Sequence, residues 1–152
     1  MSKVTVGWRE WASLPELNIP AIKVKIDTGA RTSALHAFMV EEFQENKLIK
    51  VRFGMHPIRN RPDIERTCVA DVIDRRVISD SGGHREMRYV IQTPIRMGNQ
   101  AWPIEVTLTN RETMNFRMLL GRTAMTPRLL VDPSSSYLMG TYYSEDAYKE
   151  EL

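Results

Sequence analysis

The fold of this chain is indicated by one short stretch, Val24-Lys25-Ile26-Asp27-Thr28-Gly29-Ala30. Apolar residues alternate with lysines up to the carboxylate, which predicts a β-strand with one buried face over 22–26. Thr28 and Gly29 then favour a sharp turn, so the strand presents Asp27 at its end. An isolated Asp-Thr-Gly is also typical of an ordinary Asx turn, and the rest of the sequence has to decide between the two interpretations.

A second informative run lies far downstream and reads Met118-Leu119-Leu120-Gly121-Arg122. Together with the Asp27 segment, this run resembles the pattern of the retropepsin-like aspartic proteases. In that family, the Asp-Thr-Gly loop lies under a second strand of two apolar residues followed by glycine. The resemblance implies an all-β, retropepsin-like closed barrel with one lobe per chain.

A narrower resemblance covers most of the chain. Residues 25–37, 79–91, 120–125 and 130–133 are similar to bacterial proteins labelled ATP-dependent zinc proteases. Members of that family often accompany ATP-grasp ligases that add glutamates to a ribosomal protein. The resemblance implies an aspartic endopeptidase-like hydrolase, a peptide or protein substrate, and an ATP-grasp ligase as a candidate partner.

Length and composition are those of one globular domain, which we expect to span residues 1–152 with a frayed acidic tail at 145–152. The chain has 152 residues, of which 42% are hydrophobic and 26% charged, with a formal net charge of +2. Its single cysteine, Cys68, excludes a disulfide-framed secreted scaffold. No apolar run suits a membrane span or a signal peptide, so we expect a cytoplasmic protein with no membrane partner. The weak net charge and the lack of an aromatic-rich RNA motif argue against nucleic acid.

Many short strand patterns separated by turns predict the barrel. The expected strands are 4–8, 22–26, 35–43, 48–53, 68–78, 87–95, 102–109, 118–120, 129–131 and 137–139. We expect a turn at Asn46-Lys47 and one helical turn at 123–125. We also expect 68–78 to pair with 87–95 across a hairpin at 81–83, where glycines permit positive φ.

Aspartic-protease chemistry needs two carboxylates that share one proton, one as general base on a water and the other as proton donor to the scissile carbonyl. By resemblance, the catalytic residues are Asp27, Thr28 and Gly29. The chain has one well-supported Asp-Thr-Gly, so two-fold symmetry would supply the second carboxylate. We therefore expect a homodimer, with segments 4–8 and 137–139 at its interface.

Asp80-Ser81-Gly82 is a rival second motif, but the sequence between the two motifs is too short for a complete lobe. No second apolar-apolar-Gly run follows it before Met118. The segment is better interpreted as the tip of a hairpin, and the resemblance makes this hairpin a candidate flap over the cleft. A plain surface hairpin is the alternative. The expected substrate-binding residues are Ala30, Arg31, Ser81, Gly82, Gly83 and His84.

The sequence departs from the retropepsin pattern after the Asp-Thr-Gly. The family pattern continues Ala-Asp, and that aspartate pairs with the arginine after the apolar-apolar-Gly run. Here the position holds Arg31, so Arg122 lacks its usual partner. We therefore predict either that Arg31 meets an acidic group of the substrate or that it is a solvated or structurally paired arginine.

No metal or nucleotide motif is present: the sequence has no His-Glu-x-x-His, no Cys-x-x-Cys and no glycine-rich Walker loop. The candidate metal ligands His36, His56, His84 and Cys68 are scattered. We expect no metal and no cofactor, so that any ATP dependence would come from a partner protein.

A second hypothesis is a non-catalytic retropepsin-fold module that binds an acidic, glutamate-rich peptide or protein partner. The candidate basic face is Arg52, Arg59, Arg61, Arg66, Arg75, Arg76, Arg85 and Arg88. Neighbouring carboxylates weaken any such patch, and a solvated surface is the alternative.

Overall fold

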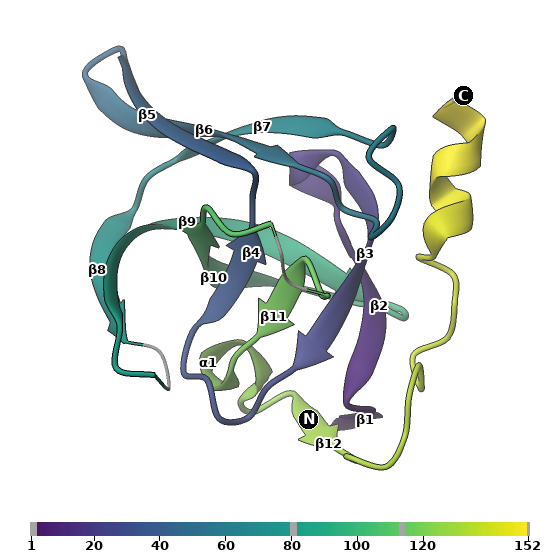
Figure 1. Cartoon of the computed structure of the whole chain (residues 1–152). Helices are drawn as coiled ribbons and strands as arrows, with labels where there is room; N and C mark the ends of the chain where they lie inside the picture. The colour runs from purple at the N-terminus through teal and green to yellow at the C-terminus, as the bar shows by residue number, and fades with distance from the viewer. Residues whose placement is uncertain (1–2, 80–81, 113–114, 152) are drawn as a thin grey trace.

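The computed structural model describes residues 3–79, 82–112 and 115–151 and is built mainly of β-strands (Figure 1). The strands are β1 (Val4–Val6), β2 (Arg9–Leu14), β3 (Ile19–Ile26), β4 (Ser33–His36), β5 (Met39–Glu45), β6 (Leu48–Met55), β7 (Arg66–Asp71), β8 (Asp74–Ser79), β9 (Arg85–Met97), β10 (Gln100–Thr109), β11 (Met118–Leu120) and β12 (Leu129–Val131). The helical segments are η1 (Pro15–Leu17), α1 (Arg122–Met125) and η2 (Glu145–Glu151).

The main sheet closes on itself. Its strand order is β10-β4-β11-β3-β2-β9-β8, and β9 also pairs with β10. Strands β10, β4, β11, β3, β2 and β9 therefore form a closed ring, with β8 attached to β9 outside it. Within the ring, β11 runs parallel to β3 and antiparallel to β4. The expectation of an all-β closed barrel is confirmed.

The strand that ends at Asp27 is anchored in the barrel by its apolar face. Ile22 and Val24 are fully buried and Ile26 is nearly so. Burying each side chain of this kind contributes roughly 1.5–3 kcal/mol. Because side chains alternate along a strand, Lys23 and Lys25 lie on the opposite, outer face.

Two segments that we predicted as single strands are each divided in the structure. The predicted strand 35–43 breaks at Phe38, whose N–H binds the Gly54 carbonyl, so the chain leaves the barrel and enters a separate sheet β5-β6-β7. The predicted strand 68–78 breaks where the chain returns, with Val72 bonded to Ile49 and Ile73 to Val90. Consequently β7 pairs with β6, and only β8 pairs with β9 as expected.

Several shorter predictions hold. The turn at Asn46-Lys47 joins β5 and β6, and both residues have the positive φ of the favoured two-residue hairpin turns. The helical turn at 123–125 is found within α1. Strand β2 was not predicted. One of its inward positions is Glu10, a fully buried carboxylate, which interrupts the apolar alternation expected of a strand.

The segment after β12 differs from expectation. Residues 137–139 form no strand: Tyr137 has a φ of 56°. The next two N–H groups, of Leu138 and Met139, donate to the buried Glu10 carboxylate at 2.9 and 3.0 Å. The expected frayed tail is instead the short helix η2, held because the Tyr148 side chain is buried and hydrogen-bonded to Ala21.

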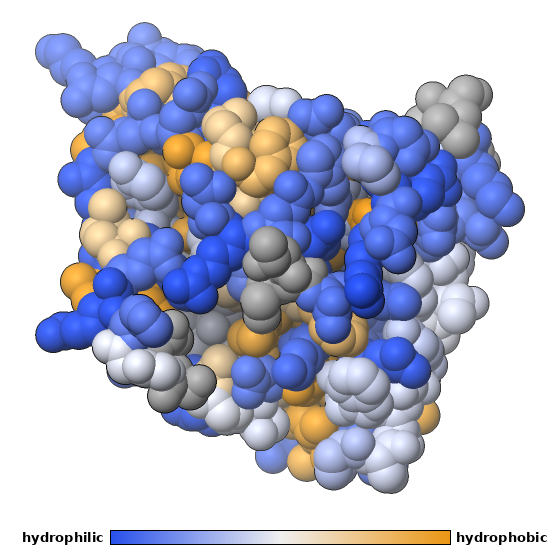
Figure 2. Space-filling view, viewed as in Figure 1, coloured by the Kyte–Doolittle hydropathy of each residue, from blue (hydrophilic) through white to orange (hydrophobic). Residues whose placement is uncertain are grey.

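The face shown in Figure 2 is mostly hydrophilic, and its hydrophobic side chains occur in small separate groups. None of the helical segments in the described part of the chain has the length and apolar character of a membrane span.

Candidate active site

The backbone at Asp27 is fixed by the two strands beside β3. The Asp27 N–H donates to the Leu120 carbonyl of β11 at 2.9 Å, and the preceding Ile26 N–H donates to the Trp8 carbonyl at 2.8 Å. Asp27 is only half-buried. The barrel therefore holds this carboxylate rigidly at a strand end while leaving it accessible.

The Asp-Thr-Gly turn orients the carboxylate itself. The Gly29 N–H donates to Asp27 Oδ1 at 2.9 Å, and the Ala30 N–H donates to the Asp27 carbonyl at 3.2 Å. Thr28 and Gly29 are exposed. One carboxylate oxygen is thus oriented by the main chain, as a positioned general base requires.

The second apolar run packs directly against this loop. A Cβ atom at Gly121 would lie 2.6 Å from the Thr32 carbonyl carbon and 2.9 Å from that of Arg31, so only glycine fits there. The Gly121 N–H also donates to the buried Ser33 hydroxyl at 3.0 Å. The close approach explains why the sequence pairs an Asp-Thr-Gly with an apolar-apolar-Gly run.

Arg122 takes a new partner in place of the missing aspartate. Its guanidinium donates to the Thr28 carbonyl at 2.9 Å, and its backbone N–H donates to the Ala30 carbonyl at 2.8 Å. The carbonyl of Arg31 in turn accepts hydrogen bonds from the N–H and hydroxyl of Thr123. The Arg31 side chain is exposed, so it is available to a ligand.

A cavity of about 730 Å³ separates the Asp27 loop from β8. Its lining residues are Gly29, Ala30, Arg31, Thr32, Arg76, Val77, Ile78, Ser79, Glu105, Arg122 and Thr123. In Figure 1 the tip of the β8–β9 hairpin and the loop after β3 lie at the same end of the barrel. The end of β8 next to the hairpin tip therefore faces the Asp27 loop.

The predicted substrate-binding residues divide into two groups. Ala30 and Arg31 line this cavity, whereas Gly82, Gly83 and His84 lie at the exposed hairpin tip and are not among its lining residues. Ser81, like the rival Asp80, lies outside the described residues. Of the described hairpin residues, those at 76–79 of strand β8 border the cavity and those at 82–84 do not.

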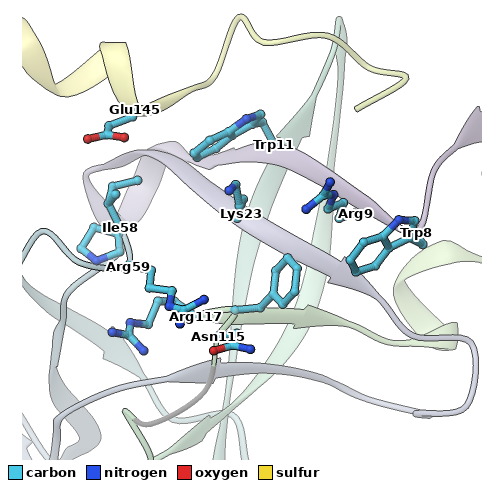
Figure 3. Close-up of a pocket in the computed structure, with 11 residues that line it drawn as sticks. Trp8, Arg9, Trp11, Lys23, Ile58, Arg59, Asn115, Arg117 and Glu145 are labelled. Carbon is cyan, nitrogen blue, oxygen red and sulfur yellow. The ribbon is translucent and has the colours of Figure 1, made fainter. Parts of the chain in front are cut away.

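A second cavity, of about 330 Å³, was not expected from the sequence. It is lined by Trp8, Arg9, Trp11, Lys23, Pro57, Ile58, Arg59, Asn115, Phe116, Arg117 and Glu145. Figure 3 shows Trp11 and Glu145 on one side of this hollow and Arg117 and Asn115 on the other. The sequence gives a signal for one of these lining residues. Lys23 and Lys25 alternate with buried residues, and this alternation puts both lysines on the same strand face as Asp27.

Most arginines of the predicted basic face carry carboxylate partners. Ion pairs join Arg52 to Glu41, Arg61 to Asp63 and Glu145, Arg75 to Glu42, Arg76 to Asp74 and Glu105, and Arg88 to Glu86. These pairs neutralise much of the face that the sequence suggested for an acidic peptide.

The candidate metal ligands have other contacts. His36 Nδ1 lies 2.7 Å from the Thr109 hydroxyl, and burial lowers the His36 pKa to about 4. His56 pairs with Glu112, and the Cys68 thiol donates to the Leu17 carbonyl, while burial raises its pKa to about 11. Across residues 3–79, 82–112 and 115–151, no three His, Cys, Asp or Glu side chains form a group that could hold a metal.

Comparisons with known proteins agree with this geometry. A family model described as RimB-like, retropepsin-like aspartic endopeptidase RimB, matches residues 5–141. A crystal structure of a protein of unknown function from Legionella pneumophila superposes with a TM-score of 0.75 at 25% identity, covering 91% of this chain and 99% of that chain.

Curated relatives carry a different kind of name. A "probable alpha-L-glutamate ligase" from Shewanella pealeana is 47% identical over 139 residues, which are 91% of this chain and 30% of that protein. One of the same name from Desulfotalea psychrophila is 44% identical over 155 residues, 99% of this chain and 33% of that protein. The chain thus spans about a third of the length of the curated relatives it matches.

Proposed function

Because the chain belongs to the RimB-like family of retropepsin-like aspartic endopeptidases, we propose that it hydrolyses peptide bonds as a homodimer with one Asp27 from each subunit. The observation that carries this proposal is the placement of Asp27. The half-buried carboxylate stands at the end of β3, is oriented by the Gly29 N–H, and belongs to a loop that borders a cavity of about 730 Å³.

The reaction follows from two carboxylates that share one proton. The ionised carboxylate removes a proton from a water molecule, and the water oxygen attacks the peptide carbonyl carbon. The protonated carboxyl group donates its proton to the carbonyl oxygen, which gives a tetrahedral diol. When the C–N bond breaks, the protonated carboxyl group gives its proton to the leaving amine, and the other carboxylate takes a proton from a hydroxyl of the diol, which becomes the new carboxyl group. The dyad therefore again holds one proton.

Two features support dimerisation as the source of the second carboxylate. The chain contains a single Asp-Thr-Gly. The β1–β12 pair forms a separate two-stranded sheet, and Leu130 on it is 50% exposed. Unpaired strand edges and an exposed apolar side chain suit pairing with a second copy through a two-fold axis.

The β8–β9 hairpin suits the role of a flap. Its strand β8 lies outside the closed ring and pairs only with β9 in the main sheet. None of the β8 side chains is buried, so this element can open to admit a peptide and close to exclude water.

A second candidate function is binding without catalysis, favoured by the cationic second cavity and by the relatives' name. In this alternative the fold recognises an acidic, glutamate-rich peptide or protein, and a glutamate ligase of the ATP-grasp type is the proposed partner. The relatives match over about a third of their length, which is consistent with a module that works beside a ligase.

The decisive experiment compares wild type with Asp27→Asn on a mixed peptide library analysed by mass spectrometry. We expect cleavage to fall at least about 1000-fold, because the substitution removes the base and the shared proton while nearly preserving shape. Asp71→Asn is the matched control, because Asp71 is exposed on β7, in the separate sheet.

Mixing experiments test the dimer. Excess Asp27→Asn protein should suppress wild-type activity, since mixed dimers carry one aspartate, and specific activity should rise with protein concentration. Full activity from a demonstrated monomer would contradict the symmetric dyad. A folded wild-type protein that binds acidic peptides and cleaves none would favour the binding function instead.

A further inference from the structure

The β8–β9 hairpin is held over the Asp27 loop without a buried core of its own at β8. None of the β8 side chains is buried, and in the main sheet of the described residues β8 pairs only with β9. Val77, Ile78 and Ser79 of this strand nevertheless line the cavity of about 730 Å³ together with the Asp27 loop. Contacts of exposed and half-buried side chains therefore decide where the hairpin lies.

Two consecutive arginines connect β8 to different parts of the molecule. Because side chains alternate along a strand, Arg75 and Arg76 point to opposite faces of the hairpin. Arg75 forms an ion pair with Glu42 of β5, in the separate sheet. Arg76 Nη1 lies 2.9 Å from Glu105 Oε1 of β10, which belongs to the closed ring. The hairpin is thus joined to the separate sheet on one face and to the barrel on the other.

The Arg76–Glu105 ion pair lies at the candidate active site. Both residues line the cavity of about 730 Å³, alongside residues 29–32 of the Asp27 loop. Asp74 Oδ2 lies 2.8 Å from Arg76 Nε, so the guanidinium is oriented from within β8 and its Nη1 group is directed at Glu105. The pair therefore connects the hairpin to the ring beside the loop that carries Asp27.

The strength of this ion pair suits an element that has to move. The Arg76 and Glu105 side chains are 37% and 43% exposed, and an exposed ion pair of this kind contributes little net free energy. Such a contact can hold the hairpin down and still break each time a peptide enters or leaves. Buried apolar side chains in its place would oppose opening more strongly, because opening would expose them to water.

We propose that Arg76 is a positioning residue, whose ion pair with Glu105 is a latch that holds the β8–β9 hairpin closed over the Asp27 loop. The effect of the latch on hydrolysis rests on the proposed function, whereas its effect on hairpin opening does not. A closed hairpin retains the peptide and excludes water. Because the latch stabilises the closed complex equally before and during the reaction, its loss should raise KM and leave kcat nearly unchanged.

Distances between two spin labels test the latch without any peptide. One label is attached at Met87→Cys, an exposed site on the hairpin, and the other at Ala101→Cys, an exposed site on β10 of the ring. Cys68 is buried and does not compete for the label. Excess unlabelled protein leaves at most one labelled subunit in each dimer. Glu105→Gln removes the charge but keeps the side-chain shape, and we expect it to raise the ratio of long to short label distances about three- to fivefold.

The matched control for this substitution is Glu41→Gln. Glu41 forms an ion pair of the same length, 2.9 Å, with Arg52, but both residues lie in the separate sheet, so the label distances should not change. Arg76→Gln should reproduce the effect of Glu105→Gln, and the double substitution should add nothing further, because both single substitutions break the same contact. About 0.5 M NaCl should reduce the difference between wild type and Glu105→Gln, because salt screens a partly exposed pair.

The same variants, without labels, are then compared in the cleavage of a peptide that wild type hydrolyses. Glu105→Gln should raise KM about three- to fivefold, with kcat within about twofold of wild type. Equal label distances in wild type and Glu105→Gln, or equal effects of Glu105→Gln and Glu41→Gln, would overturn the latch and leave the proposed hydrolysis untouched. If no peptide is cleaved but the label distances depend on Glu105, hydrolysis fails and the latch stands.

Discussion

The outer face of β3 has two ends, and the molecule builds them differently. At Asp27 the geometry is set by the main chain: the N–H groups of Gly29 and Asp27 and the glycine at 121 leave little freedom. At Lys23 the geometry is set by side chains, in which three aromatic rings surround two cations. A main-chain site tolerates little change, whereas a side-chain site can change its ligand preference while the barrel is preserved.

Gly121→Ala should cause the largest loss of stability, because it disrupts the main-chain packing around the Asp27 loop. The added Cβ would meet the Thr32 carbonyl carbon at 2.6 Å, and backbone cannot move aside cheaply. We expect a loss of at least about 3 kcal/mol in the free energy of unfolding, measured with urea.

The control for this substitution is Gly83→Ala, where the new Cβ meets nothing within 4 Å and only the φ of 83° is unfavourable. It should cost about 1 kcal/mol. Equal losses for the two variants would show that the contact between the two glycine-containing runs is unimportant.

Glu10→Gln should lower the stability of the region around Lys23, because it releases the segment that carries Tyr137. The buried carboxylate accepts hydrogen bonds from the N–H groups of Gly7, Leu138 and Met139. An amide offers one acceptor oxygen and turns an NH₂ toward a donor, so we expect a loss of about 2–3 kcal/mol in urea unfolding. Glu16→Gln, at an exposed site, should change stability by less than about 0.5 kcal/mol.

The buried His36 should make the stability of the barrel depend on pH. Burial, with contributions from Arg88, Arg117 and Arg111, lowers its pKa from 6.5 to about 4, so the unfolded chain binds the proton first. The folded state therefore has its full stability with respect to His36 above pH 6.5, and this stability is lost as the pH falls toward 4. Urea unfolding should show a loss of about 2 kcal/mol between about pH 7 and about pH 5.

His36→Gln keeps a hydrogen-bonding side chain near Thr109 but cannot titrate. Its stability should change little over the same pH interval. A variant that loses stability as steeply as wild type would assign the acid sensitivity to other groups.

Salt should give the smallest effect and should distinguish the two ends directly. Repulsion among Arg9, Lys23 and Arg59 is screened at high ionic strength. Raising NaCl from about 0.05 M to about 0.5 M should therefore stabilise wild type by up to about 1 kcal/mol more than Lys23→Gln. An identical salt dependence of the two melting temperatures would mean that the cavity carries no unbalanced charge.

The Asp27 end could be predicted from the sequence, and the Lys23 end could not. The signals for Asp27 are contiguous: an alternating strand, an Asp-Thr-Gly and an apolar-apolar-Gly run, each only a few residues long. The cationic cavity combines side chains from residues 8–11, 23, 57–59, 115–117 and 145. No local pattern indicates that these positions meet. Of the arginines that the sequence singled out, Arg59 lines the cavity, whereas Arg52, Arg61, Arg75, Arg76 and Arg88 are ion-paired elsewhere.

By itself, the sequence determined the strand that carries Asp27, the loop after it, the glycine that packs against that loop and the hairpin joining β8 to β9. These are properties of local backbone conformation, which alternation, turn residues and glycine specify within a few residues. Only the tertiary structure decided where the chain leaves and re-enters the barrel, that Glu10 holds the segment at 137–139, and which cations line the second cavity. Those features depend on ring closure, which brings distant segments of the chain together.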